Sequence, residues 1–134
     1  MAEVTDQLLS LLKEVFGWKE FRPVQKQVVE KVFLGVDTLA ILPTGGGKSL
    51  CYQVPGLAKE GICLVISPLV ALMKDQVDYL KARGVKAVSL HAGMSVREID
   101  TVLDNCIRGG VKFLYLSPER LKTELFVERF KQMN

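Results

Sequence analysis

The sequence predicts an α/β fold, a mostly parallel sheet with helices on both faces, preceded by two helices. Beyond residue 36, short apolar runs alternate with segments that carry apolar residues at helical spacing, and this alternation is typical of strand–helix units. The run over residues 62–66 is continuously apolar, as expected for a strand covered on both faces. A chain of 134 residues with 49% apolar residues is long enough for one packed core, so we expect one domain over residues 1–134.

The two leading helices follow from periodicity and from their terminating residues. Apolar side chains recur at helical spacing over residues 5–16, and Gly17 ends this helix. Pro23 suits the first turn of the second helix, which Gly35 closes.

Three residues near the start of the second helix are candidates for holding a base: Trp18, Arg22 and Gln25. The Gln25 amide offers a donor and an acceptor, which suits an adenine edge. The planar groups of Trp18 and Arg22 can stack on a base. The alternative is that Trp18 packs in the core and the other two side chains are solvated, and residue chemistry alone leaves both interpretations open.

A glycine-rich loop follows the apolar run over residues 38–42, which predicts a buried strand. Glycines let successive N–H groups converge on one anion, and the following helix turns its positive end to the same point. We expect Lys48 to reach the outer phosphates of a nucleotide and the Ser49 hydroxyl to ligate Mg²⁺. The expected loop consists of Thr44, Gly45, Gly46, Gly47, Lys48 and Ser49.

The loop departs from the full G-x-x-x-x-G-K-[ST] pattern, because Leu42 stands where the first glycine belongs. The alternative is a flexible glycine-rich turn with a solvated lysine. The order strand, loop, helix favours the nucleotide site. Pro55 falls inside the helix after the loop and is expected to kink or end it.

Three further strand–helix units are predicted, with strands over residues 62–66, 85–90 and 111–116. Ser67-Pro68 and Ser117-Pro118 each supply an N-cap followed by a first-turn proline, so each should open a helix. Ser95 and Glu98 form a capping box for the helix between them, which should extend to about residue 107.

Parallel strands place their carboxyl ends at one edge of a sheet, where ligands of open α/β folds bind. The glycine-rich loop, both Ser-Pro pairs and the turn at His91 all follow strands, so we expect them on one edge. The two Ser-Pro helix starts could hold the phosphates of a polymer, or they could be good capping and nothing more.

Composition narrows the other possibilities. Three cysteines without a C-x-x-C pair, and His91 as the single histidine, favour buried free thiols over a zinc site or a nucleophilic triad. A net charge of +3 permits a nucleic-acid partner without arguing for one. Without a membrane-spanning run or a signal-peptide pattern, we expect a cytoplasmic protein, or a nuclear one in a eukaryote.

Motifs in order along almost the whole chain resemble the amino-terminal motor lobe of RecQ-family DNA helicases. They are the stretch from Phe16 to Gln25, the Leu-Pro-Thr-Gly-Gly-Gly-Lys-Ser-Leu-Cys-Tyr-Gln run over residues 42–53, Ser67 through Val77, and Leu116 through Leu121. The Leu-Met-Lys-Asp-Gln-Val run within the third motif distinguishes this family from generic helicases.

The resemblance implies a RecA-like lobe that uses ATP and Mg²⁺ to move 3′-to-5′ on DNA and separate its strands in repair and recombination. It implies that Trp18, Arg22 and Gln25 bind adenine and that residues 44–49 bind the triphosphate. It also implies a DNA-facing surface at Ser67, Pro68, Lys74, Ser117 and Arg120. Partners would be DNA at a single-strand/duplex junction and the second motor lobe.

The family pattern continues with an Asp-Glu-Ala-His motif, and this chain contains no adjacent Asp-Glu pair. We therefore expect a fragment of an enzyme that binds ATP with little turnover by itself. Because a strand would be missing from its sheet, we also expect an exposed sheet edge prone to self-association. Two other interpretations stay open: a non-catalytic nucleotide- or nucleic-acid-binding module, and a small-molecule kinase, although no basic lid follows Lys48.

Overall fold

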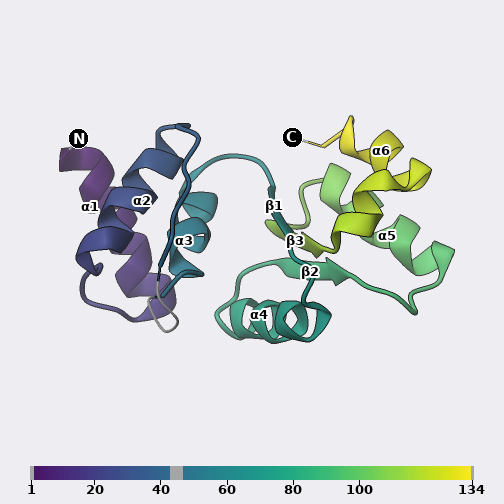
Figure 1. Cartoon of the computed structure of the whole chain (residues 1–134), viewed down its shortest axis with the longest axis horizontal. Coiled ribbons are helices and arrows are strands. Elements are labelled where there is room, and N and C mark those ends of the chain that lie inside the picture. The colour runs from purple at the N-terminus through teal and green to yellow at the C-terminus, as the bar shows by residue number, and fades with distance from the viewer. Residues whose placement is uncertain (1, 43–46, 134) are drawn as a thin grey trace. The chain divides into compact units, whose positions relative to one another are not determined.

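The structure is a computed structural model that describes residues 2–42 and 47–133 (Figure 1). The chain divides into two compact units, Met1–Glu60 and Gly61–Asn134. The assignment of residues 1–134 to a single lobe stays a prediction.

Among the described residues of the first unit, the main elements are three α-helices. Helix α1 (Ala2–Leu11) continues into a π-helical turn, η1 (Leu12–Phe16), and Gly17 ends it with a φ of 77°. Helix α2 (Pro23–Phe33) begins at the predicted proline, and α3 (Leu50–Ala58) packs against both α1 and α2. The two leading helices are therefore confirmed. Their shared core includes Leu8, Leu12, Val29 and Val54, all fully buried.

The strand predicted over residues 38–42 is wrong in this structure. These residues form no strand, and the side chains of Leu39 and Ile41 are 88% and 87% exposed. A strand exists only where a neighbouring strand accepts and donates its backbone hydrogen bonds. Within residues 2–42 and 47–133, no strand pairs with this segment.

Pro55 lies inside α3, and the helix continues past it to Ala58. Of the two predicted effects of Pro55, ending the helix is therefore wrong, and a kink there stays a prediction. Proline removes one backbone donor, but the remaining turn is closed by the Lys59 N–H, which donates to the Pro55 carbonyl at 3.0 Å.

The second unit contains a three-stranded parallel sheet. Its strands are β1 (Cys63–Ile66), β2 (Ala87–Leu90) and β3 (Phe113–Leu116), in the order β1-β3-β2. Phe113 stands opposite Cys63 on one side and Ala87 on the other. The three predicted strands are confirmed, each starting one or two residues later than the apolar pattern suggests.

Helices cover both faces of this sheet, as the α/β prediction requires. Helix α4 (Val70–Ala82) lies on one face, while α5 (Val96–Ile107) and α6 (Glu124–Phe130) lie on the other (Figure 1). The central strand β3 has every side chain fully buried. The core beneath α5 and α6 consists of Leu90, Ile99, Leu103, Cys106, Leu114, Leu116 and Phe126.

The predicted helix starts differ in outcome. Ser95 accepts a hydrogen bond from the Glu98 N–H at 3.1 Å, so its capping role is confirmed. Ser117 precedes a short 3₁₀-helix, η2 (Pro118–Lys122), and Thr123 in extended conformation separates it from α6. The hydroxyl of Ser67 accepts from the Leu69 N–H at 3.2 Å, and α4 begins only at Val70. Ser67 therefore closes a turn instead of capping the helix.

Candidate functional site

The Gln25 side chain is the centre of the candidate nucleotide site. It lies in the first turn of α2 and is only 4% exposed. Its Oε1 accepts a hydrogen bond from the Arg22 N–H at 2.9 Å, and its Nε2 donates to the Gly47 carbonyl at 3.0 Å. One buried amide therefore connects the entrance of α2 with the end of the glycine-rich loop, 22 residues away.

Gly47 has to be glycine for two reasons. Its φ of 74° lies in the left-handed region that side chains disfavour. A Cβ built there would clash with Gln25 Nε2. The close approach of the Gln25 amide to the loop therefore depends on the missing side chain.

A small cavity of about 110 Å³ lies beside this contact. The indole of Trp18 is 56% exposed, so the alternative of core packing for Trp18 is wrong, as is the alternative of a solvated Gln25. Arg22 is exposed at the cavity. Two lining residues, Glu20 and Leu50, were not singled out from the sequence, although Glu20 stands between the two candidates Trp18 and Arg22. The lining consists of Trp18, Glu20, Arg22, Gln25, Gly47 and Leu50.

The phosphate end of the site is described only in part. Thr44, Gly45 and Gly46 lie outside the described residues. Lys48 is exposed, and Ser49 immediately precedes α3. Gly47 with its left-handed backbone, the exposed Lys48 and the start of α3 follow one another in the chain, and groups of these kinds suit a nucleoside polyphosphate.

The carboxyl ends of the three strands in the second unit meet at one edge, as the sequence predicts for Ser67, His91 and Ser117. The glycine-rich loop belongs to the first unit, so its predicted place on the same edge stays a prediction. The Ser67 N–H donates to the Leu116 carbonyl at 3.0 Å, which places the ends of β1 and β3 side by side. Arg120 Nη2 donates to the His91 carbonyl at 3.0 Å and connects the ends of β3 and β2.

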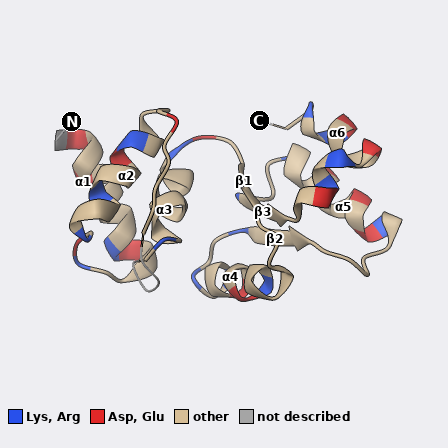
Figure 2. Cartoon of the chain, viewed as in Figure 1, with Lys and Arg blue, Asp and Glu red and all other residues tan. Residues whose placement is uncertain are grey.

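The residues proposed for DNA contact vary in their surroundings. Lys74 and Pro68 are exposed, while Ser67, Ser117 and Arg120 are half-buried. The pKa of Glu119 is lowered, first by a hydrogen bond from its own backbone N–H and then by one from the Ser117 hydroxyl. The predicted anion site at Ser117 therefore already has a carboxylate beside it. Figure 2 shows basic residues distributed over both units.

The remaining reactive side chains are those of three cysteines and a single histidine. All three cysteines are free thiols; Cys51 and Cys106 are buried as predicted, whereas Cys63 is only half-buried. Burial raises the pKa of all three thiols, that of Cys106 to about 11. His91 is exposed, with Nδ1 2.9 Å from the Ala92 carbonyl. In residues 2–42 and 47–133, no cluster of metal ligands occurs and no helix has the length and apolar character to cross a membrane.

Residues 22–134 match the DEAD/DEAH box helicase family. The chain belongs to the DEAD/DEAH box helicase family. Its fold is therefore that of a RecA-like helicase lobe. The matched region contains both helix α2 and the glycine-rich loop.

The names of individual relatives describe a narrower group of helicases than the family does. The chain is 46% identical over 120 residues to the ATP-dependent DNA helicase RecQ of Haemophilus influenzae, covering 90% of this chain and 19% of the relative. It is 45% identical over 128 residues to the probable ATP-dependent DNA helicase RecS of Bacillus subtilis, covering 95% and 25%. The putative ATP-dependent DNA helicase Q1 of Caenorhabditis elegans is 42% identical over 119 residues, covering 87% and 19%. The chain thus spans a fifth to a quarter of these relatives.

Proposed function

We propose that this chain is the ATP-binding part of a DNA helicase of the RecQ type, which couples ATP hydrolysis to 3′-to-5′ strand separation. The observation that carries the proposal is the Gln25 amide, buried and hydrogen-bonded to the glycine-rich loop at Gly47. A base held beside Trp18 would then be connected directly to the loop that grips the phosphates.

In this proposal, Trp18, Arg22 and Gln25 hold adenine. The backbone of Thr44, Gly45, Gly46 and Gly47 surrounds the triphosphate. Lys48 is the catalytic cation on the outer phosphates, and the Ser49 hydroxyl is a ligand of Mg²⁺. The metal supplies charge neutralisation at the phosphates when bound.

The second unit would face DNA. Ser67, Pro68, Lys74, Ser117 and Arg120 lie at or after the strand ends that meet at one edge, or on the helix that follows. Positive side chains and helix-start N–H groups suit a phosphate backbone. The expected partners are DNA at a single-strand/duplex junction and a second motor lobe, which together with this chain would form the helicase motor.

The wider role is inferred from the resemblance to RecQ-family helicases, since the names of the relatives give only the helicase activity. We propose action in DNA repair and recombination, in the cytoplasm at the nucleoid of a bacterium or in the nucleus of a eukaryote. This part of the proposal rests on family membership alone.

The test is ATP turnover by the protein that contains this chain, with and without single-stranded DNA. We expect strong stimulation by DNA and loss of turnover by at least 100-fold in Lys48→Ala, because one positioned charge on the transferring phosphoryl group is worth on the order of 10²–10³ in rate. Lys31→Ala is the matched control, because Lys31 is exposed in the last turn of α2. It should retain full turnover.

Saturable ATP binding without turnover, at any DNA concentration, would indicate instead a non-catalytic nucleotide-binding module. Turnover that ignores both DNA and Lys48→Ala would contradict the nucleotide site itself.

A further inference from the structure

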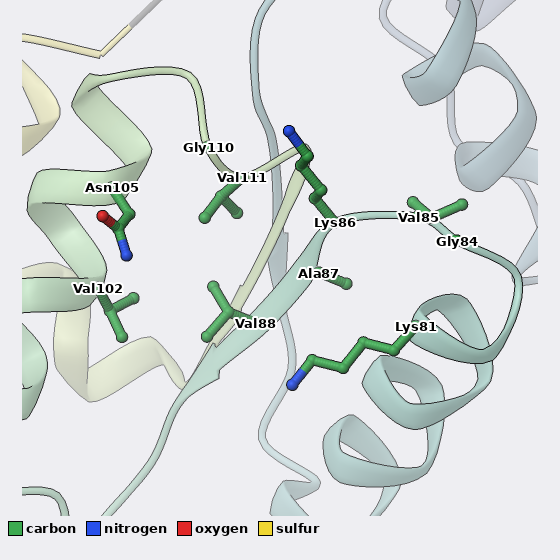
Figure 3. A pocket seen from close by; sticks show the side chains of 10 residues that line it. All are labelled: Lys81, Gly84, Val85, Lys86, Ala87, Val88, Val102, Asn105, Gly110 and Val111. Atoms are coloured by element: carbon green, nitrogen blue, oxygen red, sulfur yellow. The ribbon is translucent and has the colours of Figure 1, made fainter.

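A groove of about 380 Å³ follows the outer edge of the sheet in the second unit, far along the chain from the nucleotide site (Figure 3). In the order β1-β3-β2, strand β2 has β3 as its single neighbour among the described residues, so no described strand pairs with its other edge, which is called the open edge below. The groove wraps the amino-terminal half of β2 and is walled by α4 on one side and α5 on the other. Its lining is Lys81, Gly84, Val85, Lys86, Ala87, Val88, Val102, Asn105, Gly110 and Val111.

The hydrogen-bond pattern shows which peptide groups face this edge. The Lys86 carbonyl accepts a hydrogen bond from the Phe113 N–H at 3.1 Å, so this carbonyl points toward β3. The backbone N–H and C=O groups of successive residues in a strand point to opposite edges, so those of Val88 also point toward β3. The N–H and C=O groups of Ala87 and Ser89 therefore point outward along the open edge.

The side chains of the groove differ between its two walls. Val88, Val102 and Val111 form an apolar wall on the α5 side, with Asn105 beside them (Figure 3). On the α4 side, Lys81 extends its ammonium group along β2. A strand added here would direct alternate side chains to the two walls, apolar ones toward the valines and polar ones toward Lys81.

Charge in the groove has one sign. Lys81 and Lys86 are exposed, and the lining contains no carboxylate. The nearest residue of opposite charge along α5, Asp104, is already paired with Arg108 at 3.1 Å. Two lysines next to outward-facing peptide groups favour an anionic peptide over a neutral one.

We propose that the open edge of β2 binds an extended acidic segment of a partner protein, which adds to the sheet as a further parallel or antiparallel strand. Its apolar side chains pack on Val88 and Val102 and its carboxylates pair with Lys81, while Lys86, just before β2, adds positive charge to the groove. This proposal is independent of the nucleotide site.

Two other occupants suit the groove less well. A second copy of this chain would offer its own residues 85–90, which contain a lysine and no carboxylate. Single-stranded nucleic acid is bound by stacking bases on aromatic rings, and the lining contains none.

The probe is a blocked octapeptide that alternates valine with glutamate, titrated into this chain and followed by NMR. We expect saturable binding, with slowed hydrogen exchange at the Ala87 and Ser89 amides, because strand addition hydrogen-bonds both. The same peptide with lysine in place of glutamate should bind at least about tenfold more weakly. Absence of saturation, or equal binding of the two peptides, would overturn the proposal.

Two variants separate charge from backbone pairing. Lys81→Glu should weaken the acidic peptide about threefold to tenfold, since its charge then repels the carboxylates. Ser89→Pro removes an outward N–H while leaving the β2–β3 ladder intact, and Ser89→Ala is its matched control with the N–H retained. We expect Ser89→Pro to abolish binding and Ser89→Ala to preserve it, with equal melting of the two variants confirming that both fold.

The remaining outcomes identify a different occupant. Protected Ala87 and Ser89 amides in the absence of peptide, together with a dimeric mass in solution, would assign the edge to a second copy and overturn the proposal. A DNA oligonucleotide that displaces the peptide and shifts the NMR signals of Lys81 and Lys86 would assign the edge to nucleic acid. That result would also overturn the proposal.

Discussion

Two equally apolar stretches of this chain have opposite fates. The Phe-Leu-Tyr-Leu run of β3 in the second unit is paired on both sides and fully buried. The run over residues 38–42 in the first unit has Leu39 and Ile41 almost fully exposed and no strand beside it. Apolar side chains therefore favour a strand, but a strand forms only where a neighbouring strand supplies its backbone hydrogen bonds.

The largest predicted difference concerns these two stretches directly. Leu114→Ala should lower the free energy of unfolding by about 2–5 kcal/mol, because it opens a cavity in a filled core. Leu39→Ala should change it by less than about 0.5 kcal/mol, as for other exposed sites. Urea denaturation of both variants measures the difference. Equal losses would show that residues 38–42 are buried in solution, and the comparison would fail.

The next prediction compares two glycines with similar backbone angles, one in each unit. Gly47 has φ 74° and Gly109 has φ 83°, but a Cβ on Gly109 meets nothing within 4 Å. Alanine at either position strains the backbone, whereas Gly47→Ala also displaces the Gln25 amide. We expect Gly47→Ala to cost about 1–3 kcal/mol more than Gly109→Ala. It should also weaken ATP binding at least tenfold, measured by calorimetry, with Gly109→Ala unaffected in binding.

A third prediction concerns a polar atom buried in the first unit. Gln53 is 1% exposed, and its Oε1 has no hydrogen-bond partner among the described residues. Leaving such an atom unsatisfied costs about 1–3 kcal/mol, so Gln53→Leu should stabilise the chain by up to that amount in thermal unfolding. Gln27→Leu, at an exposed position of α2, is the control and should have little effect. A destabilised Gln53→Leu variant would show that the amide finds a partner in solution.

The smallest expected effect is a pH dependence in the second unit. Burial raises the pKa of Cys106 from 9.0 to about 11. The folded state therefore holds this proton more tightly than the unfolded state, and its contribution to stability is complete below pH 9.0 and lost as the pH rises toward 11. Urea unfolding between these limits should show a decline that is shallower in Cys106→Ala. Identical slopes would place the Cys106 thiol in solvent.

The candidate site was predictable where the chemistry is local. From residue types, Pro23 marks the start of α2 and the glycine-rich loop marks the candidate phosphate-binding segment, whereas the candidate base-binding role of Trp18 to Gln25 came from the family resemblance and stays a prediction. Their connection was not predictable, because the hydrogen bond between Gln25 and Gly47 spans 22 residues and depends on how α2 packs on α3. The place of Glu20 in the cavity lining was also not predictable, because nothing in its residue type distinguishes it from a solvated glutamate.

Helix starts show the same division. Ser95 caps α5 as its sequence pattern indicates, since both partners of the cap lie within three residues. Ser67 and Ser117 share a Ser-Pro pattern, yet one closes a turn before α4 and the other precedes a 3₁₀-helix and binds Glu119 through its hydroxyl. Neighbouring chain segments decide between these local conformations, which differ little in intrinsic energy.

The sequence by itself determined most of the helices, the three sheet strands and the chemical character of the candidate nucleotide site, because periodicity, capping and loop composition act over a few residues. Tertiary structure alone decided which apolar run became a strand and which edge of the sheet stayed open. It also decided which buried amide met the loop. Those outcomes depend on hydrogen bonds and packing between segments distant in the chain, and such contacts leave no signature in the residues of either segment.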